Sequence, residues 1–206
     1  MTFAAVLSDL DGVLVDTGDE VERVWREWAG EQGLDPDHVA RAMHGVPAFH
    51  VITAVAPQLD AAAEAERVDR IHAQSGGEAL PGAARLLREV SPLAVVTACS
   101  PPLAAARFRA AGLPAPAVLI TSHDTGRGKP HPDPYLAAAA ALGVEPAECV
   151  VIEDAPAGVA AGKAAGMTVW AVTITHEAEE LAAADVIAAD VEALLPVLTR
   201  NGVKGP

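Results

Sequence analysis

The chain is poor in cysteine and in basic residues, and each shortage excludes a class of protein. Its two cysteines, Cys99 and Cys149, are too few for a disulfide framework or a cysteine zinc site, so we expect a reduced, cytoplasmic protein. Only 14 lysines and arginines stand against 28 aspartates and glutamates, which gives a formal net charge of -14. That charge repels the phosphates of a nucleic acid or an anionic membrane, so neither is an expected partner.

Long apolar runs are also missing. No stretch is long enough to cross a bilayer, and the first residues reach Asp9 before the apolar segment of a signal peptide is complete. The chain is nevertheless 51% hydrophobic, largely through alanine, which favours helices. Its 206 residues suffice for one large domain or for one domain that carries an insertion.

Short runs rich in valine and isoleucine alternate with helical segments, which is typical of an α/β fold with a parallel sheet. We predict strands at residues 4–10, 93–97, 118–121, 149–152 and 168–172, and an edge strand near Val186. Residues 16–80 lack such runs and read as several helices. The sequence therefore predicts a core of residues 1–15 and 81–206, interrupted by an inserted α-helical domain of residues 16–80.

Polar side chains stand where the predicted strands end. They are Asp9 and Asp11 after the first strand, Thr97 after the second, Lys129 in the loop after the third, and Glu153 and Asp154 after the fourth. Because ligands of a parallel sheet bind beyond the carboxyl ends of its strands, we expect these residues to converge.

Asp9 and Asp11 are two residues apart, so their side chains point the same way if the strand continues through them. One carboxylate can then attack phosphorus while the other protonates the leaving oxygen. Gly12 permits a sharp turn that brings backbone N–H groups toward a phosphate. An isolated Asp-x-Asp-Gly is more often a simple turn, and it is the other three segments that favour phosphoryl transfer.

An anion that attacks a phosphoryl group needs a cation to neutralise both, and Mg2+ with oxygen ligands is the usual solution. Asp154, with Glu153 beside it, is the expected further carboxylate for the metal. Lys129, one of only three lysines, is expected to bind phosphate and to shield the acidic residues from one another. Thr97 can donate its hydroxyl and the amides that follow it to phosphate oxygens.

In this order along the chain, Asp-x-Asp-Gly-Val, Thr, Lys-Pro and Glu-Asp resemble the motifs of the haloacid dehalogenase (HAD) superfamily. The resemblance implies a Rossmann-like core with a helical cap. It implies Asp9 as a nucleophile that forms an aspartyl-phosphate and Asp11 as the general acid and base. It also implies two ligand sets: phosphate bound by Thr97, Ala98 and Lys129, and Mg2+ held by Asp9, the Asp11 carbonyl and Asp154, with Glu153 next to the metal or helping to hold it.

Within the superfamily the chain is more similar to sugar-phosphate and glycerol-phosphate phosphatases of the 2-deoxyglucose-6-phosphate phosphatase type. The similarity lies in Met43-His44-Gly45, in residues 128–135 and in residues 153–158. It implies a Mg2+-dependent phosphatase whose partner is a small phosphate ester, such as a sugar or polyol phosphate. In the cap, His44, Gly45 and Trp25 are the candidates to face the substrate, with Trp25 alternatively part of the apolar core of the cap.

The chain departs from these relatives at two places. Ala98-Cys99-Ser100 follows Thr97 where they usually have Ser-Gly-Ser, so one phosphate contact is expected from the backbone alone and Cys99 is interpreted as a small filler. Val46-Pro47 stands where they commonly place a basic residue. Because of the second departure, the sequence does not identify which phosphate ester is the substrate.

Three alternatives also stay open, as does the oligomeric state. A hexose phosphomutase of the β-phosphoglucomutase type shares the core motifs, but its cap lysine is missing here, and its cap arginine would have to come from Arg23, Arg26, Arg41, Arg67 or Arg70. A signalling receiver module also accepts phosphate on an aspartate, but such modules are shorter and have no helical insertion. A substrate-binding module without activity is disfavoured, because every motif residue is present.

Overall fold

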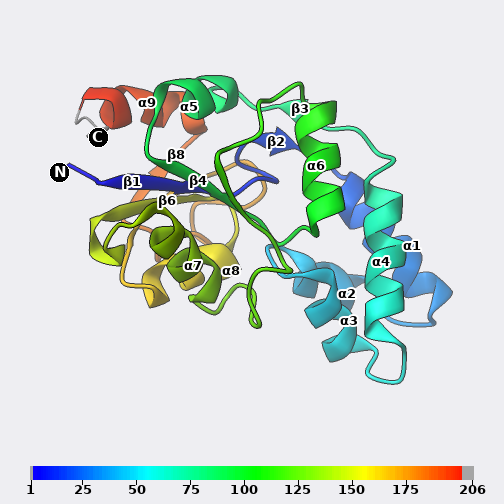
Figure 1. The fold of residues 1–206 in the computed structure, drawn as a ribbon. Coiled ribbons are helices and arrows are strands. Elements are labelled where there is room, and N and C mark those ends of the chain that lie inside the picture. The colour runs from blue at the N-terminus through cyan, green and yellow to red at the C-terminus, as the bar shows by residue number, and fades with distance from the viewer. Residues whose placement is uncertain (1, 201–206) are drawn as a thin grey trace.

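A six-stranded parallel sheet forms the centre of the computed structural model, which describes residues 2–200 (Figure 1). The strand order is β5-β4-β1-β6-β7-β8. The strands are β1 (Ala5–Ser8), β4 (Leu93–Val96), β5 (Val118–Ile120), β6 (Cys149–Glu153), β7 (Thr168–Val172) and β8 (Val186–Ala188). Each neighbouring pair is parallel. The predicted α/β fold is therefore confirmed, and the expected strand near Val186 lies at the edge.

Helices cover both faces of this sheet, which explains why its central strands are apolar along their length. One face packs against α5 (Ala83–Glu89), α6 (Pro101–Ala110) and α9 (Val191–Arg200). The other face packs against α7 (Asp133–Leu142) and α8 (Pro156–Ala164), and the short 3-10 helix η1 (Pro146–Glu148) precedes β6. Every residue of β1 and β6 is buried.

The first strand is shorter than predicted, because its pairing with both neighbours ends at Ser8. The prediction that Asp9 and Asp11 lie on an extended strand is wrong, since both follow β1 in a loop. The loop turns at Gly12, which has a φ of 75°, and Asp11 then forms an isolated bridge with Val15. The two carboxylates thus lie just beyond the carboxyl end of β1, in a tight turn.

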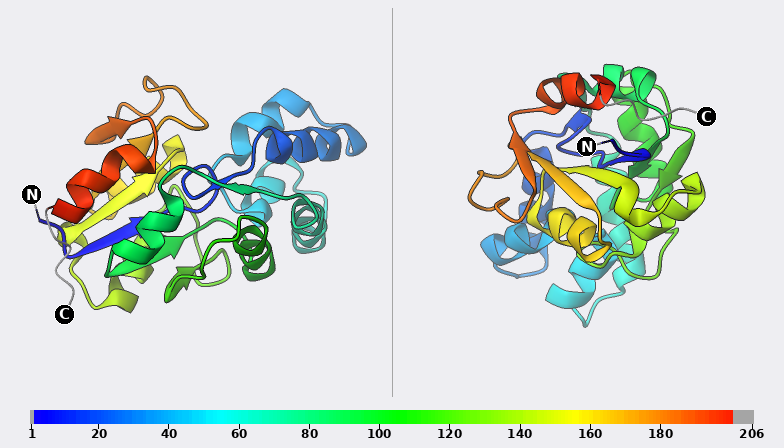
Figure 2. Two further views of the ribbon diagram at one scale, coloured as in Figure 1. Left: turned by 90° about the horizontal axis from the view of Figure 1, so that it is seen from above. Right: turned by 90° about the vertical axis from the view of Figure 1, so that its left-hand side faces the viewer.

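Between residues 16 and 80 the chain leaves the sheet and forms four helices, which stand beyond one end of the strands (Figure 2). They are α1 (Glu20–Glu31), α2 (Pro36–Met43), α3 (Ala48–Val55) and α4 (Ala61–His72). They enclose a separate apolar cluster around Trp28, Ile52 and Val68. We propose that this unit, residues 16–80, is the predicted helical cap, and we call it the cap below.

Two short antiparallel strands, β2 (Val15–Asp16) and β3 (Glu78–Ala79), lie where the chain enters and leaves the cap. Two of the four cap helices, α2 and α4, begin at a capping aspartate: in α4 the Asp60 carboxylate accepts hydrogen bonds from the backbone N–H groups of Ala62 and Ala63. Within residues 2–200, no helix is both long and apolar enough to cross a membrane.

Candidate active site

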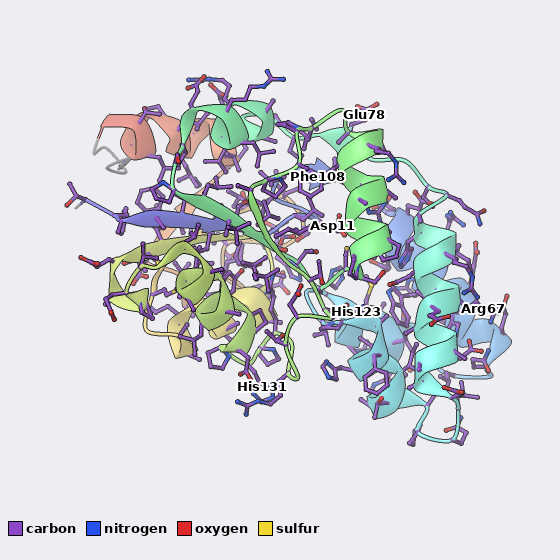
Figure 3. All side chains as sticks on the ribbon, in the orientation of Figure 1. Asp11, Arg67, Glu78, Phe108, His123 and His131 are labelled. Atoms are coloured by element: carbon purple, nitrogen blue, oxygen red, sulfur yellow. The ribbon has the colours of Figure 1, made fainter. Side chains whose placement is uncertain are left out.

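The predicted site residues converge beyond the carboxyl ends of the strands, opposite the cap. A cavity of about 280 Å³ lies there, and Figure 3 places Asp11 between the sheet and the cap helices. Its lining includes five of the predicted core residues and all three predicted cap residues: Asp9, Asp11, Thr97, Ala98, Asp154, Trp25, His44 and Gly45. Lys129 and Glu153 stand behind this lining, where both are buried.

Asp9 is buried, and its Oδ1 accepts hydrogen bonds from the Leu10 backbone N–H at 2.7 Å and from Lys129 Nζ at 2.9 Å. Burial, and then the charge of Glu153, raises the pKa of the Asp9 carboxyl above its usual range, while Lys129 opposes the shift. A nucleophilic carboxylate has to be ionised. The site therefore calls for more positive charge than Lys129 supplies.

The side chains around Asp9 meet that need with ligands for a cation. Carboxylate oxygens of Asp9, Glu153 and Asp154 lie within 4.8 Å of one another. Burial, and then Glu153, raises the pKa of Asp154 to about 7. Lys129 pairs with only Asp9 and Glu153, so one close ammonium group stands against three buried carboxylates. Carboxylate oxygens are the ligands that a hard divalent cation prefers, so the residues present fit Mg2+.

Glycine is required at two points beside these carboxylates. A Cβ atom at Gly12 would lie 2.0 Å from Asp154 Oδ2, and one at Gly158, in α8, would lie 1.8 Å from Glu153 Oε1. Both distances are far inside van der Waals contact. Steric contact thus explains why glycine stands at the end of Asp-x-Asp-Gly and of Glu-Asp-Ala-Pro-Ala-Gly, because each glycine lets the backbone pass directly beside a carboxylate.

Lys129 is fixed by three acceptors rather than left extended into the cavity. Its ammonium group lies 2.9 Å from Asp9 Oδ1, 2.6 Å from Glu153 Oε1 and 3.2 Å from the Val96 carbonyl oxygen. Burial lowers the pKa of Lys129, but the Asp9 and Glu153 carboxylates more than offset burial and raise it. The geometry fits the predicted shielding of acidic residues, and phosphate binding by Lys129 stays a prediction.

Thr97 lies directly after β4 and is buried. Its Oγ1 accepts a hydrogen bond from the Cys99 backbone N–H at 3.1 Å. A hydroxyl that accepts one hydrogen bond can still donate its own hydrogen. Thr97 is therefore held with a donor at the cavity wall, next to Ala98.

Asp11 lies between Arg107, which the sequence did not assign to the site, and Cys99, which it predicted to be a small filler there. Its Oδ1 is 3.3 Å from Nε of Arg107, in α6, and its Oδ2 accepts a hydrogen bond from the Cys99 thiol at 3.2 Å. Burial, and then Asp11, raises the pKa of Cys99, which keeps the thiol protonated and able to donate. Cys99 therefore does more than fill space.

The cap residues differ in how they reach the cavity. The His44 ring packs edge-to-face against His176 of the core at 4.8 Å, and burial, then His176, lowers the pKa of His44. Gly45 packs beside Ala155. Trp25 is 3% exposed and packs edge-to-face against Trp28 at 5.5 Å, so most of its ring belongs to the apolar cluster of the cap.

The arginines of the cap are absent from the cavity lining in the described part of the chain. Arg23, Arg26, Arg67 and Arg70 form ion pairs with glutamates or aspartates of the cap instead, and Arg70 lines a neighbouring cavity. The cap wall carries Asp16, Asp19, Glu22 and Asp69. Over residues 2–200, Arg107 is the one lysine or arginine that lines this cavity.

A parallel sheet with these carboxylates at its edge, beneath a helical insertion, defines a hydrolase of the HAD type. The chain belongs to the haloacid dehalogenase-like hydrolase family, whose model matches residues 3–166. The predicted superfamily and the prediction of a hydrolase are thereby confirmed.

Within that family the chain is similar to two characterised phosphatases and to one solved structure. The chain is 43% identical over 205 residues to hexitol phosphatase A of Escherichia coli (strain K12), with 95% of each protein covered. It is 32% identical over 195 residues to glycerol-1-phosphate phosphohydrolase 2 of Saccharomyces cerevisiae, covering 86% of this chain and 77% of that protein. The crystal structure of CbbY from Rhodobacter sphaeroides in complex with phosphate is 28% identical, with a TM-score of 0.78 over 95% of this chain and 99% of the other.

Proposed function

We propose that the protein is a Mg2+-dependent phosphatase that hydrolyses a small sugar or polyol phosphate through an aspartyl-phosphate on Asp9. The observation that carries the proposal is the convergence of Asp9, Asp11 and Asp154 on one cavity, with Lys129 bonded to Asp9 behind it. The names of the hexitol and glycerol phosphate relatives support the same activity.

The chemistry proceeds in two transfers. Asp9 attacks phosphorus, the bond from phosphorus to the alcohol oxygen breaks, and Asp11 gives its proton to that oxygen. Asp11 then takes a proton from the water that attacks the aspartyl-phosphate, which releases inorganic phosphate and restores Asp9. Thr97 and the Ala98 N–H bind phosphate oxygens, and Lys129 keeps Asp9 and Glu153 in place. Asp9, Asp154 and the Asp11 carbonyl would hold Mg2+, which would supply the positive charge that lets the anionic nucleophile approach the anionic phosphoryl group.

The cavity wall favours a neutral, hydroxylated leaving group. Its cap side carries Asp16, Asp19, Glu22 and Asp69, which repel a second phosphate and can accept hydrogen bonds from hydroxyl groups. A volume of about 280 Å³ lies at the lower end for ligand pockets and suits a small molecule. A monophosphate of a sugar or polyol meets both conditions.

A hexose phosphomutase is less well supported, because it has to hold a second phosphate. None of the five cap arginines lies in the described cavity lining. Four of them form ion pairs elsewhere in the cap, and the fifth is Arg41. The four cap helices also disfavour a receiver module, which lacks such an insertion.

The test is a screen of phosphate release from hexitol, glycerol and hexose monophosphates with Mg2+, run beside an assay for glucose 1-phosphate isomerisation. We expect phosphate release that EDTA and Asp9→Asn abolish, while Asp37→Asn, on the exposed surface of the cap, retains the wild-type rate. Full activity in Asp9→Asn would contradict the proposed mechanism. Isomerisation faster than phosphate release would instead identify a mutase.

A further inference from the structure

We infer that Arg107 is a positioning residue that holds the Asp11 carboxyl and links it to the segment returning from the cap. The inference rests on the proposed function, because it takes Asp11 to be the acid that protonates the leaving group. Arg107 lies in α6, and its side chain is 2% exposed. A guanidinium group so deeply buried needs acceptors on several sides.

The contact with Asp11 holds the carboxyl without occupying its hydrogen-bonding capacity. Nε of Arg107 lies 3.3 Å from Asp11 Oδ1, yet both atoms are buried and neither has a hydrogen-bond partner among the described residues. The other oxygen, Oδ2, accepts the hydrogen bond from Cys99. Two neighbours from the segment after β4 therefore fix the orientation of Asp11. Oδ1 is buried against Arg107, whereas the side chain as a whole is 29% exposed. Oδ2, which accepts only the hydrogen bond from Cys99, therefore remains able to exchange a proton with a substrate oxygen or a water.

The same guanidinium group also contacts the cap connection. Nη1 of Arg107 donates a hydrogen bond of 2.9 Å to the carbonyl oxygen of Gly76, which lies between α4 and β3 on the return from the cap. The fork of an arginine is planar and rigid, so its two ends move together. The position of the return segment and the position of Asp11 are thus coupled through one side chain.

The alternative role is direct binding of substrate by Arg107, since the residue also lines the cavity. The two roles differ in what they change. Loss of a binding group raises KM for every phosphate ester, whereas misplacement of Asp11 slows the step in which a poor leaving group needs a proton. An alkyl ester needs that proton, and p-nitrophenolate leaves without it.

The experiment compares kcat/KM for a polyol phosphate and for p-nitrophenyl phosphate in Arg107→Met and Arg107→Lys. We expect Arg107→Met to lower the value for the polyol ester roughly tenfold more than the value for the aryl ester. Arg107→Lys, which keeps a cation beside Asp11 but lacks the fork to Gly76, should show the same selectivity with a smaller loss. Arg109→Met, on the exposed side of the same helix, should match the wild type.

Equal losses for the two esters would overturn the inference, and so would a rise in KM without a change in kcat. If Arg107→Met does not fold, the selectivity of Arg107→Lys decides the question alone. A wild-type protein that hydrolyses neither ester contradicts the proposed function itself, whereas an active wild type with unselective variants contradicts only the role of Arg107.

Discussion

The hydroxyl of Tyr135 and the ammonium group of Lys129 share one acceptor, Oε1 of Glu153, at 2.5 and 2.6 Å. Tyr135 lies in α7 and is fully buried, as is Glu153. Two donors on one oxygen allow this carboxylate to stay buried beside Asp9 and Asp154. Helix α7 therefore contributes, through Tyr135, a hydrogen bond that stabilises the buried carboxylate of Glu153.

Tyr135→Phe removes one of those donors and leaves the ring in place. We expect a loss of about 1 to 3 kcal/mol in the free energy of unfolding, because Glu153 keeps Lys129 but loses a buried hydrogen bond. Urea denaturation of the metal-free variant and wild type measures the difference. Equal stability would mean that the hydroxyl contributes nothing to holding Glu153.

Lys129→Met leaves Asp9 and Glu153 without their ammonium partner. Removing one member of a buried ion pair costs about 3 to 5 kcal/mol, and we expect a loss of that size without metal, with activity reduced roughly 100-fold or more. Lys163→Met is the matched control, since Lys163 pairs with Asp185 on the surface and should cost about 1 kcal/mol or less. Similar losses in both variants would contradict the arrangement.

Stabilisation by Mg2+ should increase with pH. The pKa of Asp154 is raised to about 7 in the metal-free site, so this group stabilises the fold at low pH, and that contribution is lost as the pH rises through 7. Metal binding requires the ionised carboxylate, so protons compete with Mg2+ below that pH. Thermal melts with excess MgCl2 and with EDTA should differ more at about pH 8 than at about pH 6.

Asp154→Asn supplies the control for this measurement, because it removes both the titrating group and a metal ligand. Its melting temperature should respond little to Mg2+ at either pH. A Mg2+ effect that is the same at both pH values in the wild type would place the metal elsewhere.

We expect His72 to make the cap sensitive to acid. It is 4% exposed, and burial, then Arg107, lowers its pKa to about 4 from 6.5. Between those values the unfolded chain binds the proton more strongly, so stability falls as the pH drops from 6.5 toward 4. The contribution lost is about 2 kcal/mol at about pH 5.

His72→Leu removes that penalty. Relative to the wild type, the variant should gain about 2 kcal/mol of stability when the pH is lowered from about 7.5 to about 5, as measured by urea denaturation at the two values. A stability difference between variant and wild type that does not change with pH would show that His72 is protonated in the folded protein.

The sheet and the convergence of the candidate site residues were predictable because their signals are local. Runs of valine and isoleucine mark buried strands, and a polar residue directly after each run has to lie at the sheet edge. Arg107 and Tyr135 were not assigned because a helical arginine reads as a surface residue and a helical tyrosine as core. Only the packing of α6 and α7 against the sheet brings these two side chains to Asp11 and Glu153.

The central position of β1 determines when the site can form during synthesis. Among the described strands it leaves the ribosome first, yet its two neighbours, β4 and β6, follow only at residues 93–96 and 149–153. The four cap helices depend on contacts within 16–80 and can pair earlier, whereas long-range strand pairing is slow. The surroundings of Asp9 are therefore complete only after most of the chain has been made, and a nascent chain that stops before β6 lacks Glu153 and Asp154.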